Sequence, residues 1–148
     1  MRFKTKMKTF LHVGCGPQHK DHTTSGFNTP EWFELRLDID KSVAPDIIGT
    51  MTDMSAVETS SVDAIFSSHN IEHLSPHEVP VALSEFRRVL KPDGFTQMVL
   101  SGTLKAAGFA KVASKRREHP FYDLWAVASV SERDDTALRS LASEHFPG

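Results

Sequence analysis

The sequence has little cysteine and no long apolar run. Cys15 is the single cysteine among 148 residues, so a framework of internal disulfides is excluded. No stretch approaches the roughly 20 apolar residues that a membrane-spanning helix needs. The N-terminal sequence MRFKTKMKTF also lacks the apolar run of a signal peptide. We therefore expect a cytoplasmic protein that contacts no membrane.

An excess of charge of one sign is also missing. The 17 Lys and Arg residues face 19 Asp and Glu residues, which gives a net charge of -2. Binding to nucleic-acid phosphates needs a clear basic excess, so no nucleic-acid partner is expected. A small molecule is the favoured ligand, and assembly into a homo-oligomer stays open. The length and the 39% of hydrophobic residues fit one domain of ordinary size.

Short apolar runs alternate with polar segments along most of the chain. Phe33, Leu35 and Leu37 alternate with polar residues, which predicts a strand with one apolar face. Interleaved strands, loops and helices favour an α/β sandwich around a mainly parallel sheet. The runs of strand length are 10–13, 33–37, 46–48, 62–66, 95–100, 109–112 and 124–130.

The clearest helix signal follows the run 62–66. Residues 75–78, Ser-Pro-His-Glu, fit a capping box with proline at the first helical position. Apolar residues then recur at helical spacing up to Leu90, and Lys-Pro-Asp-Gly at 91–94 predicts the end of this helix. We expect a domain over residues 1–130, followed by a polar tail over 131–148 that holds at most a short helix.

Two strand ends carry residues that suit a nucleoside. In a doubly wound sheet, ligands bind at the carboxyl ends of the strands. The first strand ends in Gly14-Cys15-Gly16, where the missing Cβ atoms let backbone amides approach a ligand. The second ends in Asp38, whose carboxylate can accept both ribose hydroxyls. Because neither a third glycine nor a helix follows Gly16, a pyrophosphate is disfavoured, and S-adenosylmethionine (SAM) fits better than NAD.

Four segments resemble class I SAM-dependent methyltransferases. LHVGCG at 11–16 is similar to their first motif, LRLDID at 35–40 to their second strand, and GTMTDMS at 49–55 to the loop over the adenine. Residues 62–95 resemble the fourth strand and the following helix of the methyltransferase type 11 group. The resemblance implies SAM as cofactor and a Rossmann-like sandwich that ends in an antiparallel strand pair. It also implies transfer of the sulfonium methyl group to a small-molecule acceptor.

The resemblance also implies which residues bind SAM. The glycine turn would line the methionine part, Asp38 the ribose, the 49–55 loop the adenine, and the end of the fourth strand would close the site. Asp40 competes with Asp38 for the ribose, and Asp53 could instead cap a following helix. The implied cofactor-binding residues are Gly14, Cys15, Gly16, Asp38, Ile39, Asp40, Thr52, Asp53, Ser68 and His69. No catalytic residue is assigned, although His69 or His73 could take a proton from the acceptor.

Residues 69–73, His-Asn-Ile-Glu-His, also match the H-x-x-E-H signature of inverted zinc proteases. A zinc hydrolase would need both histidines on one continuous helix. Here a strand ends near Phe66 and a new helix begins just past His73, so we expect no metal site.

The region after the Lys-Pro-Asp-Gly turn is shorter than in the methyltransferases that the chain resembles. Residues 96–109 are too few for both a complete fifth strand and the helix that follows it. Either Phe95, Met98 and Leu100 form the strand, or Met98 belongs to a helix with Leu104 and Ala107. The alternative function is therefore a SAM-binding or regulatory module with weak methyl transfer.

Overall fold

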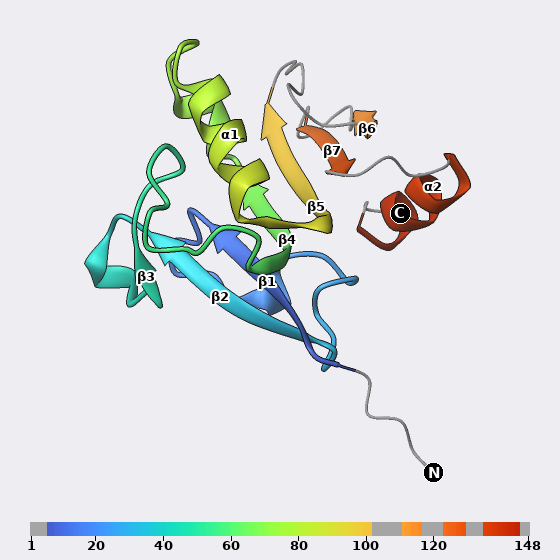
Figure 1. Cartoon of the computed structure of the whole chain (residues 1–148), viewed down its shortest axis with the longest axis horizontal. Coiled ribbons are helices and arrows are strands. Elements are labelled where there is room, and N and C mark those ends of the chain that lie inside the picture. The colour runs from blue at the N-terminus through green and yellow to red at the C-terminus, as the bar shows by residue number, and fades with distance from the viewer. Residues whose placement is uncertain (1–5, 102–110, 117–122, 130–134, 146–148) are drawn as a thin grey trace.

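The chain folds into a seven-stranded sheet with the order β3-β2-β1-β4-β5-β7-β6 (Figure 1). The computed structural model describes residues 6–101, 111–116, 123–129 and 135–145. The strands in chain order are β1 Lys8–Val13, β2 Trp32–Asp38, β3 Ile47–Ile48, β4 Val62–Ser68, β5 Leu90–Ser101, β6 Lys111–Arg116 and β7 Asp123–Ser129.

The sheet is mainly parallel. β1 pairs in parallel with β2 and β4, β2 with β3, and β4 with β5. β7 pairs antiparallel with both β5 and β6. The predicted fold class, a parallel central sheet that ends in an antiparallel pair, is therefore confirmed.

β5 decides between the two interpretations of residues 95–107. Phe95 to Val99 pair with β4, and Phe95 to Ser101 pair with β7, so Met98 belongs to a strand. The helical alternative is wrong for Met98, and its other members, Leu104 and Ala107, lie outside the described residues. Only residues 102–110 separate β5 from β6.

The helix between β4 and β5, α1 Val79–Val89, begins later than the capping box predicts. Residues 75–78 form a turn in which the Glu78 amide donates to the Ser75 carbonyl at 2.9 Å. A helix that began at Pro76 would enclose Pro80, which has no N–H for the helical ladder and whose ring clashes with the preceding turn. Starting at Val79 places Pro80 in the first turn, where no intrahelical donor is required.

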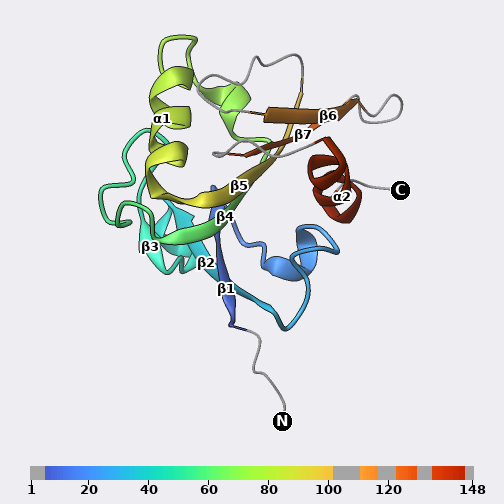
Figure 2. The same cartoon turned by 45° about the vertical axis from the view of Figure 1, so that its right-hand side comes forward.

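The two faces of the sheet are covered by different elements. Figure 2 shows α1 on one side, and α2 with the segment that follows β1 on the other. The α1 side is mainly aliphatic and includes Leu11 and Ile65. The opposite side is an aromatic cluster, which α2 Asp135–His145 joins through the buried Leu138. The predicted tail thus contributes to the core, while the boundary at residue 130 stays a prediction.

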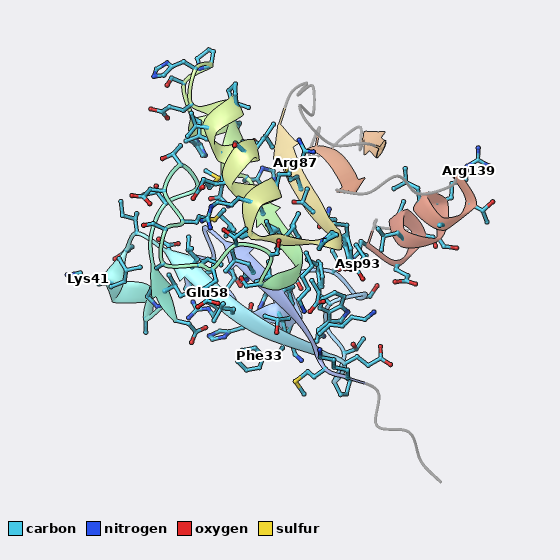
Figure 3. The ribbon with its side chains drawn as sticks, in the orientation of Figure 1. Phe33, Lys41, Glu58, Arg87, Asp93 and Arg139 are labelled. Atoms are coloured by element: carbon cyan, nitrogen blue, oxygen red, sulfur yellow. The ribbon has the colours of Figure 1, made fainter. Side chains whose placement is uncertain are left out.

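Burial along β2 does not follow the alternation of apolar and polar residues in its sequence. Phe33 is 52% exposed and points away from the sheet in Figure 3, whereas Arg36 is only 6% exposed. Short 3-10 turns follow β1, β2 and β4, and the face that carries Arg36 is buried by the loops after β1 and β2. These turns are Lys20–His22, Lys41–Val43 and Ile71–His73. None of the described helices is long and apolar enough to span a membrane.

Candidate functional site

The glycine turn after β1 lies against the end of β2. The amides of Gly14 and Cys15 both donate to the Leu37 carbonyl, at 2.9 and 3.2 Å. Gly14 and Gly16 have φ angles of +63° and +52°, which glycine adopts without the steric cost of a Cβ. The backbone of the predicted turn is therefore fixed at the carboxyl edge of the sheet.

Asp38 connects this turn to the loop after β2. Its Oδ2 accepts the Gly16 amide and its Oδ1 accepts the Asp40 amide, each at 2.8 Å. An ionised carboxylate has about four lone-pair sites, so each oxygen can accept a further bond. Asp38 can therefore hold the turn and bind a diol at the same time.

The two residues after Asp38 are an exposed isoleucine and an acid that has a hydrogen-bond partner of its own. Ile39 is exposed, and the Asp40 carboxylate accepts the Ser42 amide at 2.8 Å. That bond holds the pKa of Asp40 below its usual value. Of the two acids that compete for the ribose in the sequence analysis, Asp38 is the one bonded to the glycine turn.

The turn at residues 50–53 lies beside the same strand end. The Gly49 amide donates to the Asp38 carbonyl at 3.1 Å, which brings the start of this turn next to β2. The hydroxyls of Thr50 and Thr52 are 3.1 Å apart. The Asp53 carboxylate accepts the Ser55 amide, a bond that lowers the pKa of Asp53. Asp53 therefore closes a turn, and no helix follows it among the described residues 54–61.

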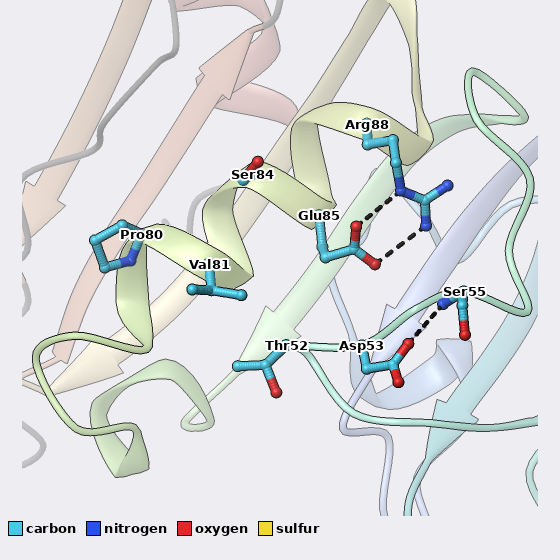
Figure 4. Close-up of a pocket in the computed structure, with 8 residues that line it drawn as sticks. All are labelled: Thr52, Asp53, Ser55, Pro80, Val81, Ser84, Glu85 and Arg88. Atoms are coloured by element: carbon cyan, nitrogen blue, oxygen red, sulfur yellow. Dashed lines mark hydrogen bonds and ion pairs between the residues drawn. The ribbon is translucent and has the colours of Figure 1, made fainter.

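A surface groove of about 680 Å³ lies between this turn and α1. Figure 4 shows Thr52, Asp53 and Ser55 on one wall and α1 on the other. The Arg88 guanidinium forms a two-pronged ion pair with Glu85, at 2.8 and 3.1 Å, and also donates to the Met54 carbonyl. This pairing lowers the pKa of Glu85 and raises that of Arg88. The contacts of Arg88 thus connect the segment after the 50–53 turn to α1.

The end of β4 meets the glycine turn through Asn70. The Asn70 side-chain amide donates to the Val13 carbonyl at 3.1 Å and to the Ser68 carbonyl at 2.9 Å. A Cβ on Gly14 would lie 2.5 Å from Asn70 Cγ, so this side chain fills the space that Gly14 leaves. Ser68 is thereby placed beside the turn, and His69 follows it directly.

His69 adopts a left-handed backbone conformation, with a φ angle of +54°. Its side chain is about half exposed, with Nδ1 3.7 Å from Glu72 Oε2. Because a left-handed residue interrupts a helix and Ile71–His73 is a single 3-10 turn, the two histidines do not share a continuous helix. The zinc-hydrolase alternative lacks the geometry it requires. Within the part of the chain that the structure describes, no three His, Cys, Asp or Glu side chains are grouped as metal ligands.

Cys15 is buried, and burial raises the pKa of its thiol. A protonated, buried thiol is a poor nucleophile, which argues against a catalytic role for the Cys15 side chain.

Two residues that hold the site together were not predicted from the sequence. Arg36 lies two residues before Asp38 on β2, and its guanidinium donates to carbonyls of the loops after β1 and β2. The alternation of apolar and polar residues along β2 predicts that Arg36 faces the solvent. Asn70 lies within the segment that matches H-x-x-E-H, and that match gives it no role. A side-chain amide soon after the end of a strand is a signal that could have identified it.

Comparison with known proteins agrees with this geometry. Residues 31–98 match the family described as Methyltransferase domain. No curated protein sequence matches the chain. SAM is the methyl donor of class I methyltransferases, so the predicted cofactor is confirmed at the level of the family.

Solved structures show the same fold. A 1,6-didemethyltoxoflavin-N1-methyltransferase from Burkholderia thailandensis aligns with a TM-score of 0.66 and 13% identity, over 86% of this chain and 72% of that chain. The PH0226 protein from Pyrococcus horikoshii gives a TM-score of 0.65 and 16% identity, over 84% and 82%. A TehB-like SAM-dependent methyltransferase from Corynebacterium glutamicum gives 0.59 and 18%, over 84% and 80%. The sheet order, the family match over residues 31–98 and these solved structures agree with the predicted resemblance to class I SAM-dependent methyltransferases of the type 11 group.

Proposed function

We propose that the chain binds SAM across the carboxyl ends of β1, β2 and β4 and transfers the methyl group to a small-molecule acceptor. The observation that carries the proposal is the Asp38 carboxylate, which holds the glycine turn through the Gly16 amide. An acid so placed can bind ribose hydroxyls while the turn lines the rest of the cofactor. Of the residues predicted from the sequence, Gly14, Gly16, Asp38, Ser68 and His69 are the proposed contacts, and Asp40, whose carboxylate accepts the Ser42 amide, is left out.

The chemistry of these residues fits SAM. A Cβ added to Gly16 would meet no atom within 4 Å, so the space above this residue is open. Asp38 supplies a carboxylate for a diol, and the glycine turn supplies backbone beside it. No helix of eight or more residues begins among the described residues 14–31, where a pyrophosphate would need one, and SAM has no phosphate.

Bound SAM supplies an electrophilic sulfonium methyl group. The contribution of the chain is to hold an acceptor in line with it, because positioning alone can provide most of the acceleration of such a displacement. His69 lies half exposed at the end of β4, where an imidazole can accept the proton of a hydroxyl or amine acceptor. Glu72 Oε2 lies 3.7 Å from His69 Nδ1, where its negative charge would favour the protonated imidazole.

Two observations bear on the acceptor and the rate. The Burkholderia relative was crystallised with S-adenosylhomocysteine (SAH) and 1,6-didemethyltoxoflavin, a small molecule, which supports an acceptor of that class. In this chain only residues 102–110 join β5 to β6, so little sequence is available there to cover an acceptor. An open pocket admits water and orients the acceptor poorly. We therefore expect slow turnover, in line with the alternative of a SAM-binding module with weak methyl transfer.

Transfer from SAM labelled on its methyl group to a metabolite extract tests this proposal. The expected result is a labelled small molecule formed at well below about 1 turnover per second, the lower end of ordinary enzymatic rates. The acceptor would then be identified from the labelled product. Label found only in added protein or RNA would contradict the proposed acceptor class, and an ordinary rate would contradict the slow-turnover expectation.

A further inference from the structure

Arg36 is a buried cation at the candidate site that the proposed chemistry does not use. Its side chain lies on the same face of β2 as Asp38 and is 6% exposed. The guanidinium donates to four backbone carbonyls, those of Gly16 at 2.6 Å, Gln18 at 3.0 Å, Val43 at 3.1 Å and Ala44 at 3.0 Å.

These four carbonyls belong to two loops that are separate in the sequence. Gly16 and Gln18 follow β1, whereas Val43 and Ala44 follow β2. A guanidinium has five N–H donors in a rigid planar fork, so it can hold several acceptors at fixed separations. Ala44 has a φ angle of +50°, which is unusual for a residue with a side chain, and its carbonyl is one of the four acceptors. The side chain therefore sets the distance between the two loops.

Asp38 holds the same two loops through their amides. It accepts the amide of Gly16 from the first loop and that of Asp40 from the second. At Gly16, the N–H is thus held by Asp38 and the C=O by Arg36, two side chains from one face of β2. This double contact fixes the backbone orientation of Gly16 on both sides of the residue.

We propose that Arg36 is a positioning residue for the cofactor, which keeps Gly16 and Asp38 in the arrangement that binds a nucleoside. The inference rests on the proposed function, that SAM binds at this edge. Without the guanidinium, the two loops lose their shared donor, and four partly buried backbone carbonyls lose a hydrogen-bond partner. Cofactor binding must then order the loops itself, and its affinity falls accordingly.

The test compares Arg36→Met and Arg36→Lys with a matched control, Lys20→Met. Lys20 is also a cation that donates to backbone carbonyls, those of Thr29 and Trp32, but these lie at the amino end of β2, away from Asp38. SAH affinity is measured by calorimetry on folded protein, and thermal unfolding is recorded for each variant. We expect Arg36→Met to weaken SAH binding at least tenfold and Arg36→Lys to recover part of this loss. The control should stay within twofold even though its melting temperature falls.

A purely structural role would lower the melting temperature of both methionine variants without separating their SAH affinities, and that outcome would overturn the inference. If Arg36→Met does not fold, hydrogen exchange of the Gly16 amide in Arg36→Lys decides. Faster exchange at Gly16 with unchanged exchange at Leu11 supports the inference, and unchanged exchange at both refutes it. A wild-type chain that does not bind SAH would instead reject the proposed function, while the exchange measurement still shows whether Arg36 holds the turn.

Discussion

Helix α2 is attached to the aromatic face of the sheet through a histidine that must stay neutral. His145 is 2% exposed, and its Nδ1 lies 2.7 Å from the Thr24 hydroxyl. Its ring centre is 4.3 Å from that of Phe27. The Thr24 oxygen also accepts the Phe27 amide, which leaves the hydroxyl proton free to donate to Nδ1. Protonation of His145 would place a cation among aromatic rings and remove that acceptor.

The size of the effect follows from the pKa of His145, which burial lowers from 6.5 to about 4. The folded protein therefore binds this proton less tightly than the unfolded chain does. Stability is complete above pH 6.5 and falls as the pH drops toward 4. At about 1.4 kcal/mol per unit of pKa, the free energy of unfolding loses about 3 kcal/mol over this range, and about 2 kcal/mol between pH 7 and pH 5.

Urea unfolding of the wild type and of His145→Phe at pH 7 and pH 5 measures this contribution. Phenylalanine keeps a ring in the cluster but cannot titrate. Burial also lowers the pKa of His12, so both proteins retain that part of the pH dependence and the difference between them isolates His145. We expect the wild type to lose about 2 kcal/mol more than the variant between the two pH values. Equal losses would show that His145 is not buried in neutral form and would refute this docking of α2.

Three further results are expected. Gly14→Ala should destabilise the fold by about 3 kcal/mol, because it adds a clash with Asn70 to the cost of a left-handed residue, whereas Gly16→Ala has only that cost, about 1 kcal/mol, and denaturant unfolding compares them. Cys15 should react with a thiol reagent only at the rate of unfolding, because its thiol is buried with a raised pKa; rapid labelling of the native protein would contradict its placement. Elemental analysis should find no stoichiometric zinc, and one zinc per chain that is lost in a His69→Ala, His73→Ala double variant would revive the hydrolase.

Local patterns in the sequence were sufficient to predict the strands and the meeting of the glycine turn with Asp38. Alternating or continuous apolar runs located β1, β2 and β4, because each strand buries its own side chains. The glycine turn and Asp38 were predictable because parallel strands place their carboxyl ends at one edge. The capping signal at Pro76 places the start of α1 three residues too early, because Pro80 is tolerated only in the first turn of a helix.

Contacts between distant segments could not be predicted in this way. Arg36 binds carbonyls of two loops, and backbone carbonyls carry no signal in the sequence. Helix α2 buries Leu138, Ala142 and His145 at helical spacing. The sequence pattern does not predict this face, because histidine is not counted among the apolar residues. In both cases a polar side chain is buried because the tertiary structure supplies its hydrogen-bond partners.

Binding of SAH by the purified chain, measured by calorimetry, tests the central claim most directly. The wild type should bind one SAH per chain. Asp38→Ala should weaken that binding by about 1.5 to 3 kcal/mol, the usual scale for hydrogen bonds to a charged group. Asp40→Ala is the matched control, because its carboxylate is turned to Ser42, and it should bind as the wild type does. Failure of the wild type to bind SAH, or unchanged affinity in a folded Asp38→Ala protein, would contradict the proposed site.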